Sequence, residues 1–160
     1  MNTEKYQKRL NKEYQSRLAY KLNDLCIMLD ALEDVNNGGC CFVAYCIANE
    51  LFKDGYKDFN LVVYNDEGEN FDSLQDIPNS QIHYAIKFQD VVINKGDFDD
   101  EYSISDIPLF NPKSLNKHYK RFSWNEIYSK KKNNLIKKTI ENYYKDFVSD
   151  LYEEQQWEKE

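Results

Sequence analysis

This sequence has little glycine and proline, no long apolar run and no hydrophobic leader. Only five glycines and three prolines occur among 160 residues, of which 41% are hydrophobic and 31% charged. That composition is typical of globular rather than disordered or fibrous proteins. No apolar run approaches the roughly 20 residues that a membrane span needs, and the N-terminal MNTEKYQKRLNKEY has no apolar core of a secretory signal. We therefore expect no membrane contact and a cytoplasmic location.

The sequence also lacks a positive net charge. The net charge is −7, which argues against a general nucleic-acid-binding protein. The charge is uneven, because nine Lys/Arg and a single acid, Glu126, lie between Lys113 and Lys138. This basic stretch is either a solvated surface or a contact for a phosphate, a protein partner or a second copy of the chain. The many Lys, Asn and Tyr residues fit an AT-rich genome, so the compartment is a bacterial cytoplasm or, if a phage encodes the protein, a virion.

Cysteine is also scarce, which limits disulfides and metal sites. The four cysteines lie within 21 positions and two are adjacent, which does not suit a disulfide framework. A zinc site from these cysteines and His83 would lack the usual C-x₂₋₄-C spacing, and the acidic residues from Asp97 onward lack the pattern of a calcium loop. We therefore predict no metal, no cofactor and unpaired thiols at Cys26, Cys40, Cys41 and Cys46.

Hydrophobic periodicity predicts an α+β fold in a single domain over residues 1–160. A small antiparallel sheet packs against a helix that carries the candidate nucleophile, and long N- and C-terminal helices flank both. Four segments are expected, namely an N-terminal helix in 1–35, a core in 36–98, an irregular part in 99–122 and a C-terminal helical region in 123–155.

Inside these segments, apolar spacings of three and four predict helices over 4–33 and 41–53. Apolar and alternating runs predict strands at 59–64, 81–88 and 91–94. A capping box beginning at Ser123 starts the last helix, with a break expected near 132–134. The terminal helices carry tyrosine and leucine stripes that serve either the core or an oligomer contact.

The stretch NNGGCCF, residues 36–42, is the strongest chemical signal. A thiol in the first turn of a helix lies near unpaired N–H groups and the positive end of the helix dipole, which lower its pKa. Gly38 and Gly39 let the backbone turn sharply, and N–H groups there can hold an oxyanion. The pattern indicates a nucleophile at Cys40 or Cys41, unless small residues and thiols simply fill the core.

A cysteine nucleophile needs a base, and the chain has two histidines. His83 lies in a predicted central strand, whereas His118 lies in a basic loop and is expected to be exposed. With 89–90 as a two-residue turn, Asn94 becomes the diagonal neighbour of His83 on the same sheet face. Asp97 would point to the other face unless a bulge turns it.

The order of helix-N-terminal cysteine, strand histidine and Asn or Asp on the next strand resembles the papain-like cysteine peptidase and transglutaminase-like superfamily. That group includes NlpC-type cell-wall peptidases and arylamine N-acetyltransferases. The similar segments are GGCCF and HYAIKF…VVINKGDF, within residues 36–98. The side chain that the family uses upstream of its cysteine to hold the oxyanion is not evident, and Asn36 or Asn37 would replace it.

The resemblance implies a thiol hydrolase or acyltransferase that acts on an amide bond of a peptide or protein through Cys41, His83 and Asn94. Phe42 directly after Cys41 matches the cysteine-aromatic pair of papain-like enzymes and of the acetyltransferases. The small Ala44 four residues after Cys40 matches the transglutaminase-like step and makes Cys40 the alternative. Asp97 is the alternative to Asn94. The competing hypothesis is a papain-like fold without turnover that serves as a binding or structural module, for example of a phage.

Overall fold

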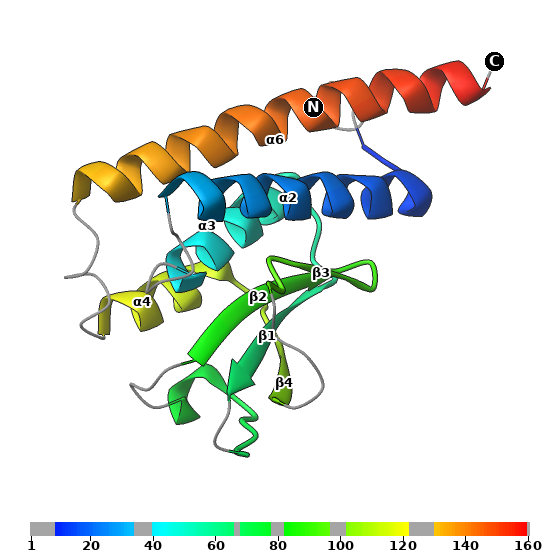
Figure 1. Cartoon of the computed structure of the whole chain (residues 1–160). Helices are drawn as coiled ribbons and strands as arrows, with labels where there is room; N and C mark the ends of the chain where they lie inside the picture. The colour runs from blue at the N-terminus through cyan, green and yellow to red at the C-terminus, as the bar shows by residue number, and fades with distance from the viewer. Residues whose placement is uncertain are drawn as a thin grey trace.

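The protein is an α+β structure in which helices pack on one face of a small antiparallel sheet (Figure 1). The computed structural model describes residues 9–33, 40–65, 68–77, 82–96, 102–121 and 130–159. Its elements are α2 (Lys12–Glu33), α3 (Cys40–Lys53), β1 (Phe59–Asn65), the 3₁₀ turn η1 (Leu74–Asp76), β2 (Ile82–Phe88), β3 (Val91–Ile93), β4 (Ser103–Pro108), α4 (Pro112–Arg121) and α6 (Lys130–Lys159). The predicted fold class is confirmed. None of the helices in the described ranges is long and apolar enough to span a bilayer.

The sheet has the strand order β3-β2-β1-β4, and neighbouring strands are antiparallel. The β2–β3 hairpin turns through Gln89 and Asp90, whose φ angles of 51° and 63° are those of a two-residue type I′ turn. Phe88 pairs with Val91, as the sequence predicted. The ladder between these strands ends at the pair Ile86–Ile93.

The two faces of the sheet carry different clusters of side chains. Tyr84 and Ile86 of β2 belong to the main core, together with residues of the helices. On the opposite face, Tyr64 and Ala85 belong to a smaller apolar cluster. Figure 1 shows that α2 and α6 run antiparallel to each other. Helix α3 packs against β2, and α2 packs against β3.

Helix α2 begins at Lys12, whereas the sequence predicted a start at residue 4. Asn11 is the N-cap of α2, because its Oδ1 accepts the Tyr14 N–H at 3.1 Å. The N–H of Asn11 donates to Oε1 of Gln155 at 2.8 Å, so the start of α2 is tied to the end of α6. The apolar pattern before Leu10 falls on residues 1–8, which lie outside the described ranges.

The prediction that residues 99–122 are irregular was wrong for the part that the structure describes. Ser103–Pro108 forms the edge strand β4, and Pro112–Arg121 forms α4. Asn111 caps α4 by accepting the Lys113 N–H at 3.0 Å through its Oδ1, and Pro112 takes the first helical position, where no N–H is needed. The fourth strand and this helix were therefore missed.

Helix α6 runs without interruption from Lys130 to Lys159, so the expected break near 132–134 does not occur. Its buried positions follow a helical period, with Ile136, Ile140, Tyr144 and Leu151 in the main core. The capping box predicted at Ser123 lies outside the described residues.

Candidate functional site

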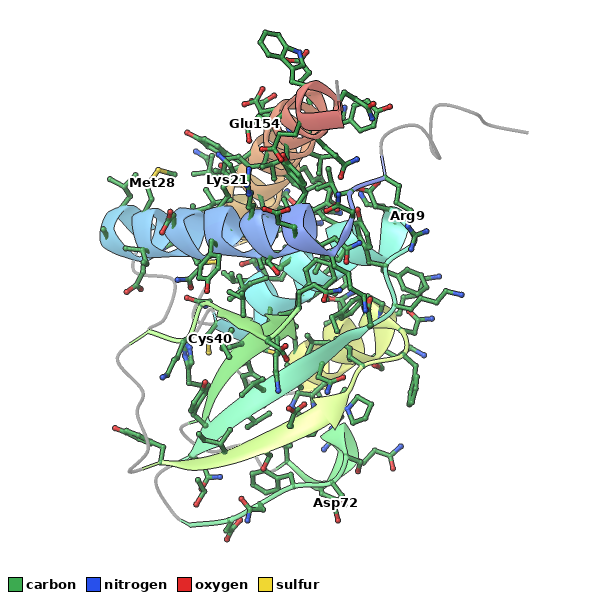
Figure 2. The ribbon with its side chains drawn as sticks, turned by 90° about the vertical axis from the view of Figure 1, so that its right-hand side faces the viewer. Arg9, Lys21, Met28, Cys40, Asp72 and Glu154 are labelled. Carbon is green, nitrogen blue, oxygen red and sulfur yellow. The ribbon has the colours of Figure 1, made fainter. Side chains whose placement is uncertain are left out.

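Cys40 is the first residue of α3, one position before the start that the sequence predicted. Figure 2 shows it below the C-terminal half of α2, beside the strands. Cys40 is 6% exposed, and the main-chain N–H groups of Tyr84, Cys41 and Cys40 itself act to lower the pKa of its thiol. Such donors stabilise a thiolate or another anion at this position.

The contact between Tyr84 and Cys40 follows from the end of the β2–β3 ladder. Phe88 and Val91 flank a two-residue turn, so Phe88, Ile86 and Tyr84 direct their main-chain groups toward β3. Because pairing stops at Ile86–Ile93, the N–H of Tyr84 lies beyond the paired part of β3. Helix α3 packs against β2, and the N–H of Tyr84 acts to lower the pKa of the Cys40 thiol.

None of the four cysteines forms a disulfide and all four are buried, and burial raises their pKa values. Burial raises the pKa of Cys40 to about 11, although the main-chain N–H groups lower it in part. Burial alone raises the pKa of Cys26 to about 12. The pKa values of Cys46 and Cys41 are also raised, again mainly by burial. The resting thiols are therefore protonated near neutral pH, and deprotonation of any of them requires a base.

His83 is 3% exposed and its ring is held on two sides. Its Nε2 lies 2.5 Å from the main-chain oxygen of Asn94, and its ring centroid lies 6.0 Å from that of Tyr64. A carbonyl oxygen only accepts hydrogen bonds, so Nε2 carries the hydrogen. The neutral imidazole then has its lone pair on Nδ1, which is the nitrogen that can take a proton.

The pKa of His83 is lowered by burial, while the Asn94 carbonyl and the Asp30 carboxylate act in the opposite direction. Asp30 also raises the pKa of Cys40, to a smaller extent than burial does. One carboxylate of α2 thus acts on both groups, which lie where α2, α3 and the start of β2 meet. They reach β2 from opposite faces, because Cys40 belongs to the main core and His83 packs beside Tyr64.

Asn94 contacts His83 through its main chain, whereas the sequence predicted a contact through its side-chain amide. The backbone of Asn94 is left-handed, with φ 70°, a conformation that Asn and Gly adopt more readily than other residues. Its N–H donates to Oδ1 of Asn23 at 2.8 Å. Asn23 of α2 therefore fixes the turn whose carbonyl holds His83, and sequence analysis did not identify it.

The remaining predicted site residues are placed as follows. Asn36, Asn37, Gly38, Gly39 and Asp97 lie outside the described residues. Cys41 is 1% exposed and belongs to the main core. Among the described residues, no group of three His, Cys, Asp or Glu side chains has the arrangement of a metal site.

His118 was expected to be exposed in a loop, but it is buried in α4 with 3% exposure. Its Nε2 lies 2.8 Å from the Tyr84 hydroxyl. Burial and the nearby Arg121 lower the pKa of His118 to about 4, so it is neutral near pH 7. Tyr84 thus contacts Cys40 through its main chain and His118 through its side chain. The signal that was overlooked is Asn111-Pro112, an N-cap followed by a first-turn proline.

Comparisons of the chain with protein-family models, with curated proteins and with solved structures give no significant match.

Proposed function

We propose that the protein is a thiol hydrolase or acyltransferase in which Cys40 attacks the carbonyl of an amide bond in a peptide or protein. The observation that carries this proposal is the position of Cys40 as the first residue of α3, where the main-chain N–H groups of Tyr84, Cys41 and Cys40 itself act to lower the pKa of its thiol. Donors fixed in a nearly dry environment stabilise negative charge at small reorganisation cost. The same argument moves the nucleophile from Cys41, which is 1% exposed, to Cys40.

His83 is the base in this proposal, because the Asn94 carbonyl leaves its Nδ1 unprotonated. Nδ1 takes the thiol proton as the sulfur bonds to the carbonyl carbon. The same nitrogen then gives the proton to the departing amine, which leaves a thioester on Cys40. Water completes a hydrolysis, or a second amine completes an acyl transfer. The step requires the thiol and Nδ1 to come within hydrogen-bond reach, directly or through one water.

The resting state in this mechanism has a neutral thiol at Cys40 and a neutral imidazole at His83. Burial keeps the pKa of Cys40 at about 11 and lowers that of His83, so neither charge of an ion pair is favoured before substrate binds. Activation is then general-base catalysis rather than attack by a preformed thiolate. Asp30 supports it, because its carboxylate favours the protonated imidazole that forms during attack.

A binding or structural module without turnover is the second candidate. It is favoured by the burial of all four thiols and by exposed apolar side chains on the terminal helices. Tyr20 and Ile27 of α2 are 61% and 60% exposed, and Trp157 of α6 is 80% exposed. In this case the protein would act by binding a partner or a second copy of the chain.

Site-resolved alkylation distinguishes the two functions. Iodoacetamide is reacted with the wild type, His83→Gln and His118→Gln at pH 6 to 9, and each cysteine is followed by peptide mass spectrometry. A catalytic Cys40 is expected to react about tenfold faster than the other thiols or more, and His83→Gln should slow that thiol alone. His118→Gln is the matched control, since it removes the other buried histidine.

Acyl transfer is then tested with 4-nitrophenyl acetate. A burst of nitrophenolate with one acetyl group on Cys40 is expected for the wild type and should be absent in Cys40→Ser. Cys41→Ser should retain the burst. Equal and slow alkylation of all four thiols, with no burst, would contradict the catalytic proposal and favour the binding module.

A further inference from the structure

A cavity lies away from the thiol site, between η1, the end of β4 and α4, with a volume of about 710 Å³. Its walls are mainly apolar and include Leu74, Ile107 and Leu109. Phe110 also lines the cavity and is 87% exposed. A concave apolar surface with an exposed aromatic ring at its edge is suited to a small organic ligand.

The polar groups of this cavity are mostly cationic or neutral. Lys117 and Arg121 line it from α4 and are exposed, and the buried His118 lies on the same helix between them. Asp72, from the segment before η1, is the carboxylate among the described lining residues. Two cations one helical turn apart beside an apolar wall favour a ligand with one anionic end.

We propose that this cavity binds an amphipathic carboxylate, with its apolar body against Ile107, Leu109 and Phe110 and its carboxylate beside Lys117 and Arg121. A free organic acid and the C-terminal carboxylate of a peptide share this chemistry. The cavity is large enough for an aromatic acid or the last residues of a peptide, since ligand cavities commonly have volumes of about 300 to 1,000 Å³. This proposal does not depend on catalysis at Cys40.

Tyr84 connects the cavity to the interior of the protein. His118 lines the cavity, and its Nε2 is held by the Tyr84 hydroxyl at 2.8 Å. This contact orients the imidazole with respect to the cavity, so His118 is a fixed polar group among apolar side chains. Such a group fixes the orientation of a ligand, as the few polar groups of small-molecule sites commonly do.

Binding is measured with the full chain by NMR titration of backbone amides. The probes are 4-phenylbutyrate as a free acid and N-acetyl-Gly-Phe as a peptide carboxylate. The matched controls are 4-phenylbutylamine and N-acetyl-Gly-Phe amide, which keep the apolar body but lack the anion. We expect one or both acids to bind and to shift amides of α4 and of residues 107–111, and the probe that binds better identifies the source.

The variant Lys117→Gln/Arg121→Gln should weaken binding of the acids about fivefold to tenfold, since each exposed charge contact contributes modestly. Lys120→Gln removes an exposed charge of the same helix that does not line the cavity, so it should leave the affinity unchanged. The proposal is overturned if neither acid binds below about 10 mM. It is also overturned if the uncharged or cationic controls bind as tightly, or if the double variant binds as well as the wild type.

Discussion

The Nε2 atom of His83 lies 2.5 Å from the main-chain oxygen of Asn94, in a turn where Asn94 has a left-handed backbone. The contact fixes which imidazole nitrogen carries the hydrogen, and it uses an atom that every residue possesses. The residue type at position 94 therefore serves the backbone conformation, while the orientation of the imidazole depends on where the turn places its carbonyl.

Replacement of Asn94 separates the main-chain role from a side-chain role. Asn94→Gly keeps the carbonyl and adopts φ 70° without strain, so the wild-type alkylation rate of Cys40 should be retained. Asn94→Ala should lower the free energy of unfolding by about 1 kcal/mol, because alanine is disfavoured in the left-handed region. The measurements are denaturant unfolding and site-resolved alkylation. A tenfold slower Cys40 in the stable glycine variant would instead assign the orienting role to the amide.

Asn23 supports the same turn from α2 by accepting the Asn94 N–H at 2.8 Å. Asn23→Ala should lower the free energy of unfolding by about 1 to 2 kcal/mol, because it leaves a largely buried N–H without its acceptor. Asn23→Asp keeps an acceptor oxygen at the same place and should lose less. Urea unfolding of the three proteins checks the order, and equal losses in both variants would show that the hydrogen bond is not the cause.

The fold was predictable where local periodicity and tertiary packing agree. The hairpin pairing of Phe88 with Val91 followed from a two-residue turn between apolar runs, and the structure has this register. Edge strand β4 escaped notice because only two of its residues, Ser105 and Ile107, are buried. Helix α4 was hidden by its basic composition, since its buried face has few apolar residues over three turns.

The candidate site was predictable in part. His83 and Asn94 are in contact, as the hairpin register indicated, but through the Asn94 carbonyl, which a sequence pattern does not specify. The effect of the Tyr84 N–H on the pKa of Cys40 depends on the β2–β3 pairing ending at Ile86–Ile93, and the length of this pairing is a tertiary property. Asn23 and Asp30 lie on α2, which is far from β2 in the sequence, so sequence spacing could not predict that they approach β2.

Tyr84→Phe tests the contact between the Tyr84 hydroxyl and His118. The substitution removes the hydroxyl that lies 2.8 Å from Nε2 and leaves the main-chain N–H of Tyr84 in place. We expect a loss of about 1 to 2 kcal/mol in the free energy of unfolding, because both groups are buried. Tyr119→Phe is the control, since its hydroxyl accepts from a partly buried Asn133 amide at 3.2 Å that water can satisfy instead. A loss in Tyr84→Phe no larger than in the control would contradict the structure.

The two buried histidines should make the protein less stable in mild acid. Burial lowers the pKa of His118 from 6.5 to about 4 and lowers that of His83 below 6.5. Below pH 6.5 the unfolded chain binds protons that the folded protein does not, so the free energy of unfolding falls as the pH drops toward 4. Above pH 7 both states carry neutral imidazoles, and the histidines contribute no pH dependence.

Carboxylates also titrate near pH 4. The contribution of each histidine is therefore measured by comparing how steeply the free energy of unfolding changes with pH in the wild type and in the variant. Between pH 6.5 and 4.5, His118→Gln should lose about 1 to 2 kcal/mol less unfolding free energy than the wild type, after allowance for solvent near the ring. His83→Gln should reduce the same loss through the other buried imidazole. Urea unfolding of His118→Gln, His83→Gln and wild type at pH 7.5, 6.5, 5.5 and 4.5 gives the slopes, whatever each variant loses at neutral pH. Parallel curves for all three proteins would mean that both imidazoles accept protons in the folded state, and would remove the argument for a neutral His83 that acts as a base.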